Sequence, residues 1–240
     1  MSAAGGLRGV LFDKDGTLFE YHGTWAPILV EAAEAAARGQ PALVPEMLEA
    51  IGYDTTSNRI RPGSIAGGGD TFGLADAWLA IAGGWERAAL IAEMDALFTR
   101  LAPERSLPVT DLPAFFGGLR GRGLTLGIAT NDVEASARAT LERFGIGTLV
   151  DFSAGYDSGH GAKPGPGMAL AFCAATGLAP HQIAVVGDNR HDLEMGRSAG
   201  AGLNIGVLTG TSAHDDLAPF ADHVIESIVA LPALLDGLKH

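Results

Sequence analysis

The sequence predicts an α/β fold, in which helices cover both faces of a largely parallel sheet. Short apolar segments typical of buried strands alternate with helical segments from residue 108 to the C-terminus. A further strand of this kind lies near the N-terminus, at 9–12, and only helical or loop segments separate it from residue 108. The 240 residues therefore accommodate a sheet-containing core and one inserted helical domain.

The first strand ends in a group of polar residues. The apolar segment 9–12 is followed at once by Asp13 and Asp15, and then by Gly16 and Thr17. Alternate residues of a strand share a face, so the two carboxylates start out pointing the same way. Adjacent carboxylates repel each other unless a cation or a shared proton compensates them. Taken alone, the pattern is also typical of an ordinary turn that ends a strand.

The segment 20–106 is predicted to be a helical insert, and the residues on either side of it, 1–19 and 107–240, are predicted to form one core. Its middle part, 53–69, is polar and rich in glycine, so we expect a loop there and no strand. Apolar residues recur at helical spacing in the rest of the insert, and Asp70 is placed to cap one helix. The predicted helices are 24–38, 44–51, 70–81 and 85–101.

Beyond the insert, helices and strands alternate regularly. The predicted strands are largely apolar, as expected for a parallel sheet that is buried on both faces. The predicted strands are 124–130, 149–153, 183–187, 203–207 and 223–225, and the predicted helices are 111–120, 133–144, 166–176, 191–199 and 227–238.

Charge and composition limit the possible partners. The net charge of −12 and the pI near 4.9 argue against nucleic-acid binding, which requires a basic surface. No apolar segment is long enough to cross a membrane, and the N-terminus lacks the pattern of a signal peptide. The single cysteine, Cys173, cannot form an internal disulfide. We therefore expect a cytoplasmic monomer or homodimer, in which a metal ion or a few placed cations attract any anionic substrate.

The other strand ends carry polar groups that complement the two aspartates. Parallel strands bring their carboxyl ends to one edge of the sheet, where ligands bind in such folds. Four strands thus deliver acidic groups, a hydroxyl group, an amide and a cation to the same edge. The residues are Asp13, Asp15, Gly16 and Thr17 after the first strand, Thr130 and Asn131 after the second, Lys163 in the loop after the third, and Asp188 and Asp192 after the fourth.

In order and spacing these motifs resemble those of the haloacid dehalogenase-like hydrolases, and in particular phosphoglycolate phosphatases with a helical cap. The resemblance covers nearly the whole chain, with the insert 20–106 in the position of the cap. It implies a Rossmann-like core of three layers with strand order 5-4-1-2-3, counting the strands along the chain. It also implies that the strands ending at Asp13 and Asp188 lie side by side.

The residue types and the resemblance together indicate a role for each acidic group. Asp13 is expected to attack phosphorus and become an aspartyl-phosphate, and Asp15 to protonate the leaving alcohol and then activate water. Mg²⁺ is the expected cofactor, because carboxylate oxygens suit a hard divalent cation. By resemblance its ligands are Asp13, the main-chain carbonyl of Asp15, and Asp188. Asp192 is expected to bind the ion directly or through water, or else to orient Lys163.

The phosphate group is expected to lie among hydrogen-bond donors and one cation. Thr130 offers a hydroxyl group and Asn131 a backbone N–H group, and the amides that follow Asp13, including that of Gly16, complete the cradle. Lys163, one of only three lysines in the chain, supplies a fixed positive charge.

Residues that are present or missing distinguish between relatives. Haloacid dehalogenases lack the second aspartate, present here as Asp15, and phosphonatases use a cap lysine, whereas 20–106 contains no lysine. We therefore expect a Mg²⁺-dependent phosphatase that hydrolyses a small-molecule phosphate monoester such as phosphoglycolate. A sugar phosphomutase similar to β-phosphoglucomutase, which relies on basic cap groups, is one alternative. A non-catalytic binding module of the same fold is another.

Substrate choice is expected to depend on the cap, which closes over the core and excludes water. Arg59 and Arg61 are candidates to bind a second anionic group such as a carboxylate, or else are exposed loop arginines. Tyr21, His22 and Trp25 follow the first motif closely and are candidates to touch the leaving group, although Trp25 also fits the hydrophobic core of the cap. Lys14, between the two aspartates, is expected to point away from the site and to leave the chemistry unchanged.

Overall fold

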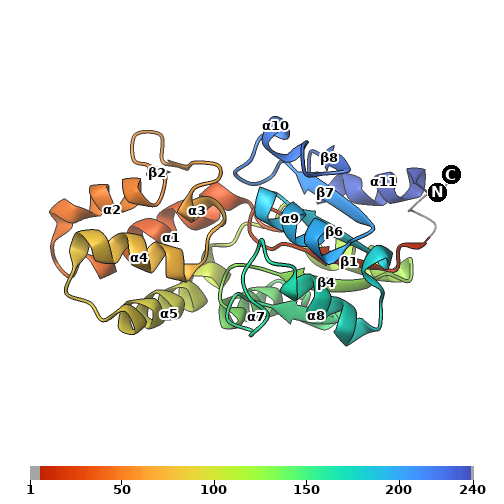
Figure 1. Cartoon of the computed structure of the whole chain (residues 1–240), viewed down its shortest axis with the longest axis horizontal. Coiled ribbons are helices and arrows are strands. Elements are labelled where there is room, and N and C mark those ends of the chain that lie inside the picture. Colours follow the sequence, from red (N-terminus) through yellow and green to blue (C-terminus); the bar gives the residue numbers. More distant parts are fainter. Residues whose placement is uncertain (1–5, 239–240) are drawn as a thin grey trace.

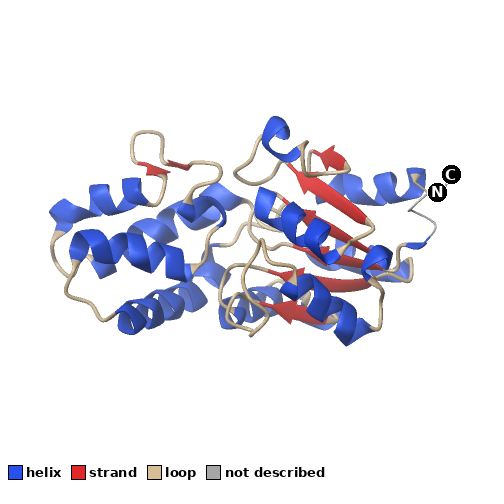
Figure 2. Ribbon diagram, in the orientation of Figure 1, coloured by secondary structure: helices blue, strands red, loops and turns tan. Residues whose placement is uncertain are grey.

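The computed structural model describes residues 6–238 and shows two parts that lie side by side (Figure 1). One part contains a six-stranded parallel sheet with helices on both faces, and the other consists mainly of helices (Figure 2). The helical part follows the first strand directly along the chain, so the core is assembled from segments on both sides of it. The predicted α/β class is confirmed.

Strand β1 (Gly9–Phe12) lies in the middle of the sheet, between β4 and β6. The order is β5-β4-β1-β6-β7-β8, and all neighbouring strands are parallel. The first five core strands along the chain take the expected order, and β8 adds a sixth strand beyond β7 that this order lacks. The other strands are β4 (Thr125–Ala129), β5 (Phe152–Ala154), β6 (Ile183–Gly187), β7 (Leu203–Val207) and β8 (His223–Ile225).

Successive residues of β1 point to opposite faces of the sheet, and each face has its own hydrophobic cluster. On one face Phe12 packs against Phe116, with ring centroids 5.5 Å apart. On the other face Leu11 lies in a cluster with Phe172. Burying each such side chain stabilises the fold by about 1.5–3 kcal/mol, which explains why the strands are mostly apolar. The core therefore has three layers, with the sheet between two layers of helices.

Capping residues mark the ends of the core helices. Asp111 precedes α6, and its side chain accepts a hydrogen bond from the N–H of Ala114 at 3.1 Å. Helix α8 ends at Gly177, which adopts the left-handed conformation with φ of 70°. Between residues 6 and 238, no helix combines the length and the apolar character that crossing a membrane requires. The core helices are α6 (Leu112–Gly121), α7 (Glu134–Arg143), α8 (Gly167–Thr176), α9 (Arg190–Ala199), α10 (His214–Leu217) and α11 (Leu231–Gly237).

The insert contains the expected helices, but its middle part is more than a loop. An antiparallel hairpin pairs β2 (Tyr53–Asp54) with β3 (Arg59–Ile60). The carboxylate of Asp54 closes the turn by accepting a hydrogen bond from the N–H of Thr56 at 2.8 Å. The expectation of an all-α insert is wrong here, because local turn chemistry, rather than an alternating apolar pattern, creates the hairpin. The helices are α1 (Tyr21–Ala36), α2 (Val44–Ala50), α3 (Ile65–Gly68), α4 (Thr71–Ala82) and α5 (Arg87–Arg105).

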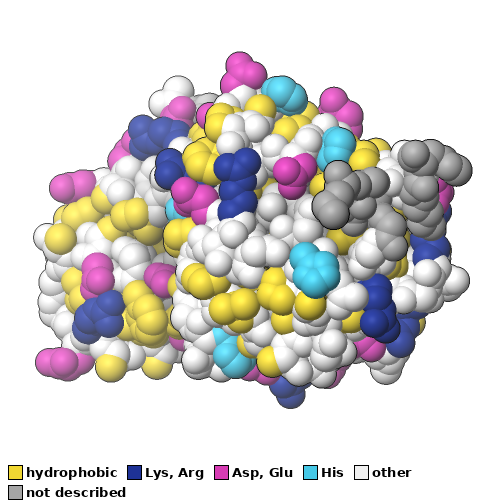
Figure 3. All heavy atoms as spheres, turned by 45° about the vertical axis from the view of Figure 1, so that its right-hand side comes forward, with side chains coloured by type: hydrophobic (Ala, Val, Ile, Leu, Met, Phe, Trp, Pro, Cys, Tyr) yellow, Lys and Arg dark blue, Asp and Glu magenta, His cyan; other side chains and the backbone are white. Residues whose placement is uncertain are grey.

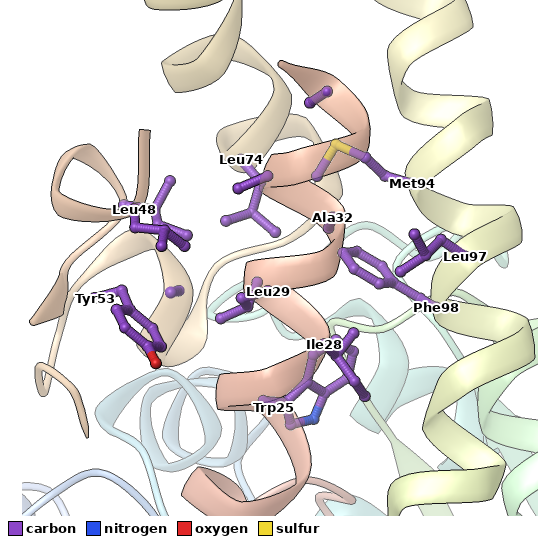
Figure 4. Close-up of a cluster of buried hydrophobic side chains, with 14 of the residues drawn as sticks. Trp25, Ile28, Leu29, Ala32, Leu48, Tyr53, Leu74, Met94, Leu97 and Phe98 are labelled. Carbon is purple, nitrogen blue, oxygen red and sulfur yellow. The ribbon is translucent and has the colours of Figure 1, made fainter. Parts of the chain in front are cut away.

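The insert has a hydrophobic cluster of its own (Figure 4). Helix α1 contributes Trp25, Leu29 and Ala32, which pack among residues of α4 and α5 such as Leu74 and Phe98. A separate hydrophobic cluster is what an independent folding unit requires. We propose on this basis that the insert is a cap domain, with the boundaries predicted from the sequence.

The two segments that connect the insert to the core run side by side. The N–H of Glu20 donates to the carbonyl of Leu107 at 2.8 Å, and the N–H of Val109 donates to the carbonyl of Leu18 at 3.0 Å. Paired linkers restrict how far the insert can move away from the end of β1.

Candidate active site

A cavity lies between the carboxyl ends of the central strands and the insert. The structure therefore brings together most of the polar residues that the sequence placed at four separate strand ends. The core lines the cavity with Asp13, Asp15, Thr130, Asn131, Lys163, Asp188 and Asp192, and the insert lines it with Tyr21, Trp25, Leu29, Leu74, Phe98 and the loop 65–71.

Lys163 lies between two aspartates at the base of the cavity. Its Nζ atom is 2.6 Å from Oδ1 of Asp13 and 2.5 Å from Oδ1 of Asp192, and all three residues are buried. Burial raises the pKa of Asp13 to about 7, even though Lys163 opposes this shift. Burial disfavours the charged lysine, but Asp13 and Asp192 together hold its pKa above the ordinary value. Lys163 therefore stays protonated next to a carboxylate that lacks full compensation.

Asp13, Asp188 and Asp192 form a group that can hold a metal ion. Each offers one carboxylate oxygen, and these oxygens lie within 4.8 Å of one another. Burial, and then the charge of Asp13, raise the pKa of Asp188 well above its ordinary value. Oδ2 of Asp13 is buried without a hydrogen-bond partner among the described residues. Three buried carboxylates this close together fit a hard divalent cation such as Mg²⁺.

Gly16 explains how Asp188 can approach the first strand. The φ angle of Gly16 is 91°, and a Cβ atom at this position would lie 2.5 Å from Cγ of Asp188. Any other residue would combine backbone strain with a collision. The N–H of Thr211 donates to Oδ2 of Asp188 at 3.0 Å and fixes the carboxylate from the other side.

Asn131 and Thr130 follow β4, as predicted, but the side chain of Asn131 has a structural partner. Its Oδ1 accepts a hydrogen bond from the N–H of Lys163 at 2.9 Å, so it holds the loop that carries the lysine. Its Nδ2 donates to the carbonyl of Gly68 in the insert at 2.9 Å. The hydroxyl of Thr130 is buried and accepts a hydrogen bond from the N–H of Asp132 at 3.1 Å.

Lys14 does not point away from the site, and the sequence expectation is wrong on this point. Its Nζ lies 2.6 Å from Oδ2 of Asp15 and 3.0 Å from Oδ2 of Asp132, and the residue is fully buried. The alternation of a strand no longer applies at this position, because β1 ends at Phe12. Sequence reasoning also missed Asp132, although it directly follows the strand-end motif.

Of the cap residues that the sequence offers as substrate contacts, Tyr21 and Trp25 line the cavity, whereas His22, Arg59 and Arg61 do not. His22 accepts a hydrogen bond from the N–H of Ile60 at 3.3 Å, and burial and the nearby Arg59 lower its pKa. Arg59 is exposed in β3. The guanidinium of Arg61 pairs with Glu49 at 2.6 Å on the surface of the insert. The geometry gives these residues no contact with the cavity.

Core side chains instead hold the glycine-rich loop of the insert over the cavity. Nδ2 of Asn189 donates to the carbonyl of Gly67 at 2.8 Å, and Nδ1 of His191 lies 3.0 Å from the carbonyl of Gly68. Within the insert itself, the hydroxyl of Tyr21 also donates to the carbonyl of Ala66. Sequence reasoning missed these contacts, although consecutive glycines at 67–69 are a signal for close approach of the backbone.

Comparison with known proteins agrees with this arrangement. A family model described as haloacid dehalogenase-like hydrolase matches residues 7–200. The chain belongs to this family. Its fold is also found in solved structures: the β-phosphoglucomutase of Clostridium difficile superimposes with a TM-score of 0.68 over 97% of both chains, at 17% sequence identity. At this level of identity the likeness shows the fold alone.

Two curated relatives are more similar to this chain in sequence than the C. difficile enzyme is. The chain is 39% identical over 107 residues to a Dickeya dadantii protein named "Probable phosphatase IndB", covering 45% of this chain and 46% of that protein. It is 31% identical over 150 residues to phosphoglycolate phosphatase of Escherichia coli K12, covering 61% of this chain and 58% of that enzyme. The matches thus span about half the length of these relatives.

Proposed function

We propose that the protein is a Mg²⁺-dependent phosphatase that hydrolyses a small-molecule phosphate monoester through an aspartyl-phosphate. The observation that carries this proposal is the group in which Lys163 lies between Asp13 and Asp192, with Asp188 close enough to share a cation. It combines a carboxylate nucleophile, a fixed positive charge and a set of oxygen ligands in one buried place.

The two aspartates of the first motif divide the reaction into two steps. An oxygen of Asp13 attacks phosphorus, the bond from phosphorus to the leaving oxygen breaks, and Asp15 gives its proton to that oxygen. Asp15 then takes a proton from water, whose oxygen attacks the same phosphorus and releases phosphate and Asp13. The unpartnered Oδ2 of Asp13 is the oxygen available for the first attack.

Charge stabilisation comes from the residues around the phosphate. In this proposal Lys163 neutralises part of the charge that develops on the phosphoryl oxygens. The hydroxyl of Thr130 and the amide of Asn131, residues that line the cavity, donate to those oxygens. Asp13, Asp188 and Asp192 would hold Mg²⁺, which when bound offsets the repulsion between the nucleophile and the phosphate. Asp192 also fixes Lys163, so it serves both groups.

The charge of the protein leaves the attraction of an anionic substrate to groups inside the cavity. On the face shown in Figure 3, lysine and arginine side chains lie in separate small groups among acidic side chains. With a net charge of −12, attraction of a phosphate ester falls to the buried lysine and the bound cation. As the sequence suggests, we propose that the enzyme works in the cytoplasm.

A sugar phosphomutase shares this fold, as the C. difficile enzyme shows, but is less well supported here. Such a mutase handles two phosphate groups. Among the described residues that line the cavity, Lys163 is the one lysine and none is an arginine, so no second side chain of this kind is there to bind a second phosphate. A sugar bisphosphate that stimulates turnover without net release of phosphate would favour the mutase.

The proposal is tested with purified protein, p-nitrophenyl phosphate and Mg²⁺. Phosphate release should stop when EDTA is added and fall to below about one thousandth in Asp13→Asn. With an ester that is radiolabelled in its phosphoryl group, acid-quenched wild-type protein should retain the label, and the Asp13→Asn variant should not. Asp111→Asn is the matched control, since asparagine caps a helix as well as aspartate does. Turnover that persists after both chelation and Asp13→Asn would overturn the mechanism.

A further inference from the structure

We propose that the leaving-group side of the cavity selects an uncharged, largely apolar alcohol and rejects a substrate with a second anionic group. This inference rests on the proposed function, because it concerns the same site. It departs from the phosphoglycolate that the sequence suggested as the model substrate.

The first observation is the apolar wall that the insert presents to the cavity. Trp25 and Leu29 of α1, Leu74 of α4 and Phe98 of α5 all line the cavity and belong to the hydrophobic cluster of the insert (Figure 4). The four side chains are buried, and Trp25 and Phe98 stack edge to face with centroids 5.2 Å apart. A wall of this kind gains free energy when it covers an apolar group and offers nothing to a carboxylate.

The second observation is the charge balance of the cavity. Six aspartates line it: Asp13, Asp15, Asp70, Asp132, Asp188 and Asp192. Two lysines contact these aspartates. Lys163 already pairs with Asp13 and Asp192, and Lys14 already pairs with Asp15 and Asp132. With Asp15 protonated, as the proposed first step requires, the other five aspartates still exceed two lysines and a divalent cation by one formal negative charge, before the phosphate enters. A further anion on the substrate would meet repulsion without a partner.

The glycine-rich loop does not replace the missing cation. The N–H of Gly67 donates to Oγ of Ser64 at 3.1 Å, and the N–H of Gly69 donates to the carbonyl of Ile65 at 2.9 Å. The carbonyls of Gly67 and Gly68 are taken by core side chains. The amides of Gly67 and Gly69 are therefore already used within the insert and do not supply a site for a carboxylate. His191, which also lines the cavity, uses its Nδ1 on the carbonyl of Gly68.

A third observation adds one polar feature to the expected alcohol. Nε1 of Trp25 is buried and has no hydrogen-bond partner among residues 6–238, and the indole lines the cavity. A buried donor without a partner costs free energy that a ligand can recover. We therefore expect a leaving group with apolar faces and one neutral acceptor, such as a carbonyl or ether oxygen.

Binding of uncleavable phosphonates tests the inference independently of turnover. Calorimetry on the Mg²⁺-loaded wild-type protein compares 3-phosphonopropionate with its neutral carboxamide, which has the same size, and with 2-phenylethylphosphonate. We expect the carboxamide to bind about tenfold more tightly than the carboxylate, and the phenyl compound most tightly. Equal or tighter binding of the carboxylate would overturn the inference. The proposed function is judged separately, by hydrolysis of p-nitrophenyl phosphate.

A charge placed in the wall supplies a second test. Ile65 lines the cavity and is 36% exposed, so it tolerates a longer polar side chain. Ile65→Arg should bind 3-phosphonopropionate about tenfold more tightly than Ile65→Gln, its uncharged control, while the affinity for 2-phenylethylphosphonate stays the same in both variants. If both variants bind the carboxylate equally, then missing positive charge is not what excludes it, and the inference fails.

Discussion

The ammonium group of Lys14 lies 2.6 Å from Oδ2 of Asp15, within an ion pair that is closed off from water. Oδ2 of Asp132 approaches the same ammonium to 3.0 Å, and the ring of Trp25 covers it at 5.6 Å from the centroid. Oδ1 of Asp15 has no hydrogen-bond partner among the described residues. Lys14 thus holds one oxygen of the proposed acid and leaves the other free to face the leaving group.

Lys14→Met should therefore impair proton transfer more than phosphoryl transfer. A positioned general acid contributes about 10²–10⁴-fold, so we expect kcat for a simple alkyl phosphate to fall about ten- to a hundredfold. Hydrolysis of p-nitrophenyl phosphate should fall much less, because its leaving group needs little protonation. A series of esters with leaving groups of different pKa measures this difference.

Stability needs its own control in this experiment. Removing one partner of a buried ion pair costs about 3–5 kcal/mol, so Lys14→Met should also lower Tm. Lys14→Arg keeps the charge and should recover most of the alkyl phosphatase activity. An equal loss of activity with every ester in the series would show that Lys14 serves the fold and not the orientation of Asp15.

Burial of Asp13 predicts how the metal-free protein responds to pH. Its pKa is raised from 3.8 to about 7 in the folded state, so the folded protein binds more protons than the unfolded chain between these values. The contribution of Asp13 to the free energy of unfolding is complete below about pH 4 and is lost as pH rises towards 7. For this residue the loss is at most about 4 kcal/mol. Asp188 and Asp132, whose pKa values burial also raises, act in the same direction.

Thermal unfolding in EDTA and in Mg²⁺ checks this prediction. Because Mg²⁺ binds the deprotonated carboxylates, it should raise Tm more at pH 7.5 than at pH 5. Asp13→Asn should make the decline of stability in EDTA shallower. A metal-free protein that becomes more stable between pH 5 and 7, with Asp13→Asn unchanged from wild type, would contradict the raised pKa.

Much of the core and its site follows from local sequence patterns. Apolar strands that end in polar residues predict both the sheet and the edge at which Asp13, Lys163 and Asp188 meet, because all parallel strands end on the same side. The prediction fails where contacts between distant segments determine the direction of a side chain. Lys14 lies just beyond β1, so strand alternation does not govern its direction, and its partner Asp132 comes from a different loop.

The insert shows the same limit. The glycine-rich segment makes Arg59 and Arg61 candidates either for the substrate or for the exposed surface, and the hairpin and the Glu49 pair place them at the surface. Which face of an insert turns toward the core depends on long-range hydrogen bonds such as that from Asn189 to Gly67. No periodic pattern in one segment encodes such a contact between residues that are 122 positions apart.

Contact between the loop and the core predicts that Gly68→Ala weakens the closed arrangement. A Cβ atom at Gly68 would lie 2.8 Å from Nδ2 of Asn189 and 3.0 Å from Nδ1 of His191, so the loop would have to shift away from the cavity. A displacement on the scale of 1 Å costs up to about a hundredfold in rate, and we expect kcat/KM to fall about ten- to a hundredfold, with KM raised. Steady-state kinetics with p-nitrophenyl phosphate measures both.

Gly118→Ala is the matched control for this substitution. Gly118 lies exposed in α6, and a Cβ atom there would meet nothing within 4 Å. Replacing a helical glycine by alanine should stabilise the protein by about 0.5–1 kcal/mol and leave kcat/KM unchanged. Wild-type kinetics in Gly68→Ala would show that the contacts of Asn189 and His191 with the loop do not hold the cap over the substrate.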